Sequence, residues 1–196
     1  IKVIDSAGSQ FPDFSTKNTN EVVLDFSTNP FSFEFLFKPN PKSNNYQVLC
    51  QKQSGSAKSI TLALDSSASK TKVDLLFFIT SGSAKLFTSA SIEKGKFSHI
   101  CATYDRDVTG KLQLYVSESL VSTSSTGFEF DTLSFERSPM YIGSGSAFSI
   151  SRNSDVGGTS YTPVQTLSGA LDEFRVFHSQ RTIDDQKKYA QKPVYP

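Results

Sequence analysis

The chain has 196 residues, 37% of them hydrophobic, and its 20 basic side chains are nearly balanced by 19 acidic ones. This length suits one large all-β domain over residues 1–196, which can bury a core without a metal or a disulfide. Balanced, interspersed charge leaves no basic stripe for nucleic acid, and no apolar run is long enough to insert into a membrane. The chain begins at Ile1 and carries no signal peptide, so we interpret it as a piece excised from a larger protein.

Short apolar or alternating runs, separated by segments rich in Ser, Gly and Asn, recur along the chain. Such runs with regular turn signals are typical of a β-sandwich or barrel. In residues 31–37 the alternation places every Phe on one face, and residues 74–80 are almost continuously apolar, which predicts a strand covered on both faces. The predicted strands are residues 22–26, 31–37, 46–52, 59–64, 74–80, 85–88, 98–104, 112–116, 139–143 and 171–177.

A single helical signal lies near the C-terminus, at residues 182–190. Thr182 is a suitable N-cap, Asp184 and Asp185 suit the positive end of the helix dipole, and Lys187 and Lys188 suit the negative end. The predicted fold class is therefore all-β, a two-sheet antiparallel β-sandwich with one short C-terminal helix.

Six pieces of sequence occur in a characteristic order. They are an alternating aromatic strand ending in Lys38-Pro39, a strand ending in Lys52, the segments 97–105 and 110–116, Ile142-Gly143, and the segment 168–177 around Asp172-Glu173-Phe174-Arg175. Together they resemble the laminin-G-like, concanavalin A-like jelly-roll family, in its pentraxin-related branch, over roughly residues 20–190. The chain departs from the family pattern at Phe97, where Trp is usual, and at 117–119, where Ser-Glu-Ser replaces an Asn-Gly turn.

The resemblance implies two stacked sheets about 10 Å apart, with a core of inward aromatic side chains. It also implies a non-catalytic binding or adhesion module for glycan or protein ligands, at an extracellular, cell-surface or particle-surface location. The alternative is a structural or decoration domain of a virion or other large extracellular assembly, docking to sister copies or neighbouring modules. Such a domain would present an apolar patch at a sandwich edge.

The longest stretch without a clear strand signal is residues 143–166. Long loops are often functional, although many are merely variable. The loop combines an aromatic ring with hydrogen-bonding groups, which sugar binding needs. The predicted ligand-binding residues are therefore Arg152, Asn153, Asp155 and Tyr161.

Catalysis is the least favoured hypothesis. Glycoside hydrolases that resemble this family place two carboxylates on one strand face, and retaining enzymes hold them about 5–5.5 Å apart. Glu129 and Asp131 would share a face, but Glu136 would point away because strand side chains alternate. His99 lies where the family has a strand histidine, so a packed or edge residue is favoured over a catalytic one.

Calcium is the cofactor that the resemblance brings into consideration. Relatives bind it with an Asp in the last strand and carbonyls near the N-terminus, and Asp172 matches that Asp. Asp25, Asp13 or nearby carbonyls could complete a site, since calcium takes six to eight oxygen ligands. The other interpretation is that Asp172 orders the terminal hairpin by hydrogen bonds.

Two cysteines are too few for a disulfide framework. Cys101 matches one half of the pentraxin disulfide, but the position of its usual partner holds Glu34 or a neighbouring Phe. A Cys50–Cys101 bridge requires adjoining strands with Cα atoms within about 7 Å. Two buried free thiols are the equal alternative, and a bridge would indicate an oxidising compartment.

Overall fold

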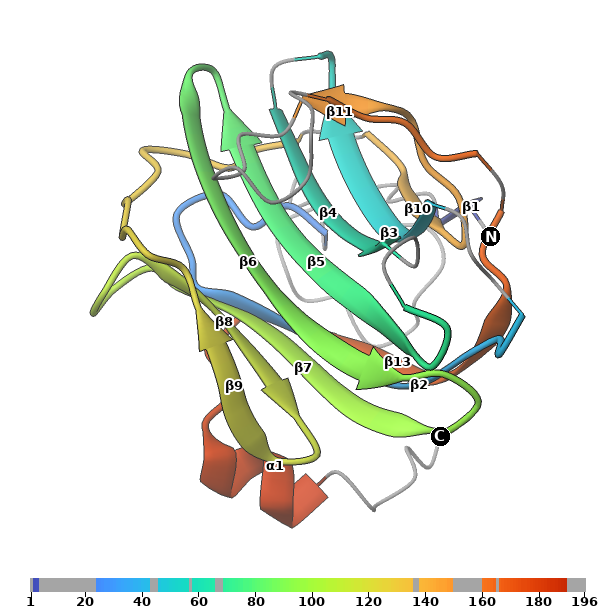
Figure 1. The fold of residues 1–196 in the computed structure, drawn as a ribbon. Coiled ribbons are helices and arrows are strands. Elements are labelled where there is room, and N and C mark those ends of the chain that lie inside the picture. Colours follow the sequence, from blue (N-terminus) through green and yellow to red (C-terminus); the bar gives the residue numbers. More distant parts are fainter. Residues whose placement is uncertain are drawn as a thin grey trace, which may run out of the picture.

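The structure is a computed structural model that describes residues 2–3, 24–42, 46–56, 58–65, 69–135, 138–149, 160–164 and 166–189 (Figure 1). These residues form short strands and one helix, α1 (Ile183–Tyr189). The strands are β1 (Lys2–Val3), β2 (Phe31–Pro39), β3 (Gln47–Ser54), β4 (Lys58–Asp65), β5 (Lys72–Ser81), β6 (Ala84–Glu93), β7 (Ser98–Asp105), β8 (Lys111–Val116), β9 (Ser119–Thr123), β10 (Met140–Ile142), β11 (Phe148–Ser149), β12 (Ser160–Tyr161) and β13 (Gly169–Phe177).

Two antiparallel sheets form the body of the molecule. One has six strands in the order β1-β10-β3-β4-β5-β6, and the other has five in the order β13-β2-β7-β8-β9. In Figure 1 the layer with β5 and β6 lies in front of the layer with β2 and β13. The predicted jelly-roll sandwich with one short C-terminal helix is confirmed.

Phenylalanine side chains fill the space between the sheets. The four Phe residues of β2, at 31, 33, 35 and 37, are at most 1% exposed, which confirms their predicted inward orientation. Phe26 stacks on Phe31 with ring centroids 4.3 Å apart and meets Phe33 edge-on at 5.8 Å. Such offset and edge-to-face pairs add to the stabilisation that comes from area burial alone.

A smaller apolar cluster lies on the outer face of the six-stranded sheet. Leu76 and Phe78 of β5 belong to it, whereas Phe77 belongs to the main core. The ribbon of β11 and β12 contributes Phe148 and Tyr161 to the same cluster. The strand β5 is therefore covered on both faces, as its apolar run predicted.

The helix α1 begins where its capping signal predicts. The Asp185 N–H donates to Thr182 Oγ1, and the Thr182 N–H donates to Asp185 Oδ2, each at a distance of 3.1 Å. This reciprocal pair is a capping box with Asp in place of Glu. The hydrogen bonds from the Thr182 side chain and backbone hold the pKa of Asp185 below its usual value. No helix in the part of the chain that the structure describes is long and apolar enough to cross a membrane.

The strand β9 was not predicted, and a strained turn connects it to β8. Ser117 and Glu118 have φ angles of 49° and 62°. Positive φ at both central residues is the type I′ geometry, which favours Asn-Gly. The turn therefore keeps the geometry expected of the family's usual residues, although neither of its own residues favours that backbone conformation.

The first prediction concerns the core. Phe33→Ala should lower the free energy of unfolding by about 3–5 kcal/mol, because its ring is 0% exposed and its loss leaves a cavity. Phe97→Ala removes the same atoms from a ring that is 54% exposed, so it should cost less than about 1 kcal/mol. Urea unfolding curves measure both values, and equal losses would contradict the core assignment.

The second prediction concerns the turn. Glu118→Gly should raise the free energy of unfolding by about 0.5–1 kcal/mol, because glycine adopts positive φ without a Cβ clash. Gly55→Ala is the reverse test, since Gly55 has φ of 60° and no neighbour within 4 Å of an added Cβ. Thermal melts of the two variants should shift in opposite directions, and shifts of the same sign would refute this account of the turn.

Candidate functional site

The structure describes only part of the predicted ligand-binding loop. Arg152, Asn153 and Asp155 lie outside the described residues. Tyr161 is described, and it is 2% exposed, with its ring stacked on Phe148 at 4.8 Å. Its hydroxyl lies 2.9 Å from the Gln47 carbonyl oxygen and 2.5 Å from that of Leu64, either of which can accept its one proton, and burial raises the pKa of its phenol. Tyr161 is therefore a core residue that fastens β12 to the sheet, and its predicted role as an exposed aromatic platform is wrong.

The two carboxylates considered for calcium do not converge. Asp25 already accepts hydrogen bonds from Ser27 N, Ser134 Oγ and Phe135 N, at 3.2, 2.6 and 3.2 Å. Asp172 lies opposite Leu36, near the other end of β2. Its Oδ1 accepts from the Glu173 N–H at 2.8 Å. No group of three or more His, Cys, Asp or Glu side chains suited to a metal occurs among the described residues. Calcium at Asp172 stays a prediction, with Asp13 outside the described residues.

Cys50 and Cys101 are separate free thiols. Cys50 belongs to the six-stranded sheet and faces the main core, whereas Cys101 belongs to the five-stranded sheet. Their strands do not adjoin, so the condition for the Cys50–Cys101 bridge is not met. Burial raises the pKa of each thiol to about 12, which leaves both thiols unreactive at neutral pH.

The acidic segment weighed for hydrolysis is irregular rather than a strand. Glu129 is exposed and its Oε1 lies 3.1 Å from Nη1 of Arg106. Asp131 is also exposed, and Glu136 lies outside the described residues. The expectation that Glu129 and Asp131 share one strand face is therefore wrong, because this segment is not a strand.

A β-bulge between Asp172 and Arg175 adds one residue to β13. The bulge turns Phe174 inward, where its ring stacks on two rings of β2 with centroids 6.0 and 5.6 Å away. It leaves Arg175 opposite Glu34 on the outer face of the five-stranded sheet. The segment 172–175, which carries the family resemblance, thus serves the core and the outer face at once.

Glu34 is the centre of a buried ionic cluster on that outer face. Its Oε2 accepts from Nε of Arg181 at 3.0 Å, and its Oε1 lies 3.3 Å from Nε2 of His99 and 3.8 Å from Nη1 of Arg175. Burial by itself would raise the pKa of this carboxyl, but the contacts with His99 and Arg181 outweigh burial and hold the pKa below its usual value. The adjoining cavity measures about 10 Å³, which admits one water molecule and no substrate.

The cluster fastens a C-terminal strap, residues 178–189, onto the sheet. The Arg181 N–H donates to Ser32 Oγ at 3.0 Å, and Ser32 Oγ donates to the Ser179 carbonyl at 2.8 Å. Gln186 of α1 is 0% exposed and donates to the Arg181 carbonyl. In Figure 1, α1 lies beside β8 and β9. We therefore interpret Glu34 and His99 as residues that hold the strap rather than as catalytic groups.

A shallow hollow of about 400 Å³ lies on the outer face of the six-stranded sheet. Tyr141 of β10 and Gln51 of β3 lie directly opposite each other there, and Tyr141 is 37% exposed. The lining combines amides, hydroxyls and one aromatic ring, and the described residues that line it include no charged side chain. Its residues are Gln51, Gln53, Gly55, Ser56, Pro139, Tyr141 and Ser146.

The side-chain amide of Gln51 holds one wall of the hollow, because it forms two hydrogen bonds with the Ser146 backbone as a neighbouring strand would. Gln51 Oε1 accepts from the Ser146 N–H at 2.7 Å, and its Nε2 donates to the Ser146 carbonyl at 3.2 Å. Glycine is needed beside it, since a Cβ on Gly145 would lie 2.7 Å from Val48 Cγ1. The hollow therefore has a fixed wall, with Gln53, Ser56 and Tyr141 as its remaining polar and aromatic lining.

Comparison with protein families agrees with this fold. Residues 11–185 match the model of Laminin_G_3, the concanavalin A-like lectin/glucanases superfamily. The chain belongs to this family. No curated protein sequence matches it.

Solved structures share the fold at low identity. The mouse laminin alpha1 chain, domains LG4-5, is similar with a TM-score of 0.51 and 15% identity, over 78% of this chain and 36% of that one. The Ruminococcus gnavus IT-sialidase CBM40, solved bound to alpha2,3 sialyllactose, has a TM-score of 0.54 and 14% identity over 82% of each chain. Domain 4 of the arabinanase AbnA from Geobacillus stearothermophilus, solved with arabinotriose, has a TM-score of 0.54 and 14% identity, over 84% and 68%.

Sequence reasoning missed every residue of the hollow. Gln51, Lys52 and Gln53 are three consecutive polar residues in β3, and this break in the apolar run was the signal that one face of the strand is not core. Tyr141 shares that face only because β10 pairs with β3, although the two are distant in sequence. No local pattern reports that pairing.

The third prediction concerns acid stability. Because the folded pKa of Glu34 is lower than its unfolded value, its ionised form stabilises the fold above about pH 4.5, and this contribution is lost as pH falls through the folded pKa. Glu34→Gln should therefore melt lower than the parent at pH 7, and the difference should shrink towards pH 3. The control is Glu93→Gln, which changes an exposed carboxylate paired with Lys96. A constant difference between parent and Glu34→Gln at all pH values would contradict the ionic role.

Proposed function

We propose that the chain is a non-catalytic, extracellular carbohydrate-binding module that holds a short neutral glycan segment in the hollow beside Tyr141. The supporting observation is the chemistry of the lining, where the amide of Gln53 and two serines lie around one exposed aromatic ring, against the fixed wall at Gln51. Sugar hydroxyls require closely spaced donors and acceptors, and the apolar face of a sugar ring packs on an aromatic ring. The volume lies within the usual range for ligand sites of about 300–1,000 Å³.

The comparisons support a binding role without naming a ligand. Two structures of this fold were solved with sialyllactose and with arabinotriose, and a third belongs to laminin. Since identity is at most 15% in these three, the ligands do not transfer to this chain. The hollow is also open, which favours weak binding that several copies of the module strengthen together.

The fourth prediction tests this proposal with Tyr141→Ala. A glycan array of neutral oligosaccharides should yield a ligand, and titration calorimetry should show at least about tenfold weaker binding for the variant, because the stacking surface is lost. Gln53→Ala should also weaken binding. Phe128→Ala is the control, since that ring is 47% exposed and does not line the hollow.

Two results would overturn the proposal. One is that no neutral glycan binds saturably, and the other is that Tyr141→Ala binds the array's best ligand as tightly as the parent does. Both measurements require that the variants melt within a few degrees of the parent, which Tyr141 permits because its ring is partly exposed.

A second candidate is the structural role at the edge of the sandwich. The strand β9 ends the five-stranded sheet, and its Leu120 and Val121 are 46% and 49% exposed. An exposed apolar edge strand is a template for pairing with another chain. Sedimentation at rising concentration tests this role: a dimer lost on Val121→Lys supports it, and a monomer throughout excludes self-association at this edge.

A further inference from the structure

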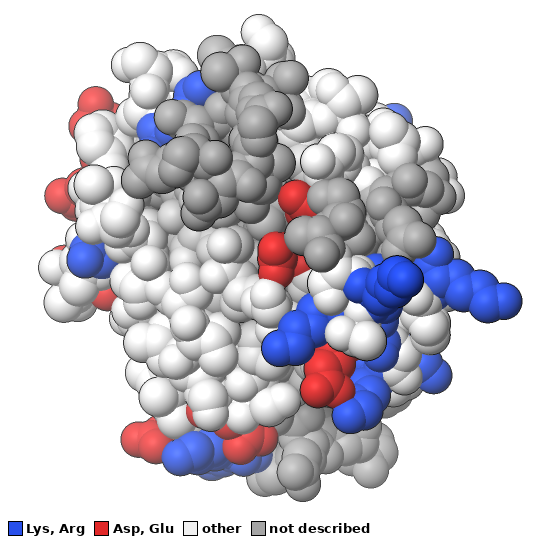
Figure 2. All heavy atoms as spheres, viewed as in Figure 1, with Lys and Arg blue, Asp and Glu red and all other residues white. Residues whose placement is uncertain are grey.

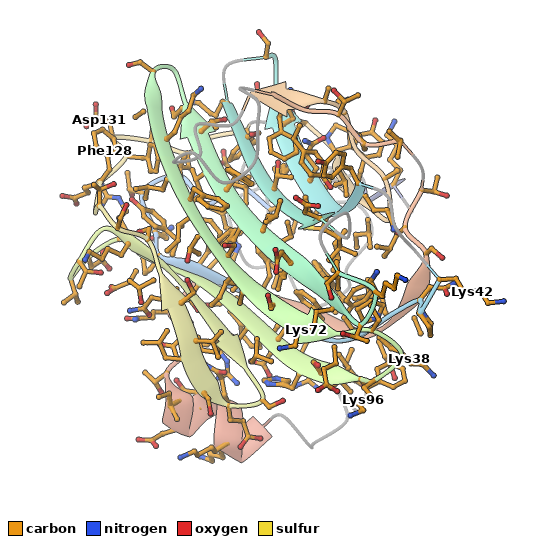
Figure 3. All side chains as sticks on the ribbon, in the orientation of Figure 1. Lys38, Lys42, Lys72, Lys96, Phe128 and Asp131 are labelled. Carbon is orange, nitrogen blue, oxygen red and sulfur yellow. The ribbon has the colours of Figure 1, made fainter. Side chains whose placement is uncertain are left out.

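Lysine side chains gather at one end of the sandwich, although the sequence balances positive and negative charge. Figure 2 shows blue spheres concentrated at the lower right of the molecule, and Figure 3 places four labelled lysines in that region. Antiparallel topology brings them together, because β2 and β6 end where β5 begins. We name this set the lysine end: Lys38, Lys42, Lys70, Lys72, Lys94 and Lys96.

The loops that carry these lysines are fastened to one another. The Gly95 N–H donates to the Pro39 carbonyl at 2.8 Å, which joins the β6–β7 turn to the end of β2. The Lys94 N–H donates to the Thr71 carbonyl at 2.9 Å, and Lys94 Nζ donates to the Ser69 carbonyl, also at 2.9 Å. The backbone that carries these lysines is therefore held in place, and a ligand does not have to order a flexible tail.

Carboxylates at this end leave much of the positive charge exposed. Glu93 pairs with Lys96 at 2.6 Å, Asp65 is only 4% exposed, and Asp74 accepts a hydrogen bond from Ser91. Asp172 borders the set from β13. Lys42 and Lys70 are exposed and form no ion pair with any described carboxylate, whereas the exposed Lys72 lies opposite Glu93 on the neighbouring strand. A cluster of like charges with few counter-charges raises the local concentration of anions.

An exposed aromatic ring accompanies the charges. Phe97 is 54% exposed, and Lys38 Nζ lies 5.7 Å from its ring centroid. The ring and the cation thus offer an apolar platform beside a positive charge. A sugar ring with an acidic substituent presents the complementary pair, an apolar face beside a negative charge.

We infer that the lysine end binds a short segment of an acidic polysaccharide, with Lys38, Lys42 and Lys72 contacting sulfate or carboxylate groups and Phe97 packing against a sugar ring. This site is distinct from the hollow. The strand β3 begins at the lysine end, and the turn after β3 lines the hollow at the opposite end. The two sites therefore differ in ligand chemistry as well as in place.

Nucleic acid is a poorer fit for the same charges. Duplex DNA carries one charge per roughly 1.7 Å of axis and binds through a long basic stripe. Here the lysines occupy one end, the chain has a net charge of only +1, and the described residues at this end include no arginine for base recognition.

The fifth prediction uses a size-defined sulfated hexasaccharide as the probe. The parent should bind it in calorimetry at low salt, and the affinity should fall as salt rises, because exposed charges are screened. Lys38→Gln/Lys42→Gln/Lys72→Gln should bind at least about tenfold more weakly. Phe97→Ala should weaken binding with no loss of charge, which separates the platform from a general attraction to anions.

The control variant removes the same charge elsewhere. Lys85→Gln/Lys111→Gln/Lys187→Gln changes three lysines outside the lysine end and should bind the probe like the parent. Tyr141→Ala should also bind it normally, so a failure of the neutral-glycan proposal would not affect this one. The inference is overturned if the parent does not bind the probe, if both triple variants lose binding equally, or if duplex DNA or anionic lipid vesicles bind more tightly through these lysines.

Discussion

The structure depends on the strict alternation of side chains along β2. Odd positions from Phe31 to Phe37 point between the sheets, and the even positions carry Ser32, Glu34, Leu36 and Lys38. The inward rings bind the sheets together by burial and ring–ring contacts. The outward positions hold the C-terminal strap at Ser32 and Glu34 and supply a lysine at the strand end. A slip of one residue in register would therefore bury the charges and expose the rings.

The bulge in β13 adapts its neighbour to that alternation. Without the extra residue, the register set at Asp172 would place Phe174 opposite Glu34 on the outer face and Arg175 opposite Phe33 in the core, so both side chains would face the wrong environment. The extra residue, with Glu173 in the left-handed region, places the ring in the core and the guanidinium beside Glu34. The burial of the Phe174 ring and of the Arg175 guanidinium offsets the local backbone strain at Glu173. The sequence Asp-Glu-Phe-Arg therefore indicates the fold and says nothing about a ligand.

The sandwich was predictable because its signals are local. Alternation in β2, the continuous apolar run of β5 and the cap at Thr182 each specify structure within a few residues. The sites were not predictable in this way. Tyr161 is of a residue type that often binds sugars, but it is buried where β11 pairs with β12. Gln51 meets Tyr141, and Pro41 lies against Gly95, only after distant segments of the chain come together.

The fold is similar at 15% identity or less because inward and outward side chains have different roles. Inward positions are constrained by packing, whereas outward positions and connections are free to change, so the fold persists while ligands differ. In this chain the two proposed sites lie at opposite ends of the rigid strand β3, which has 8 residues and spans about 26 Å. A glycan with a neutral segment and an acidic segment at that separation would engage both sites at once, and its second contact would form at high effective concentration. Selectivity would then come from the spacing of two weak contacts rather than from either contact alone.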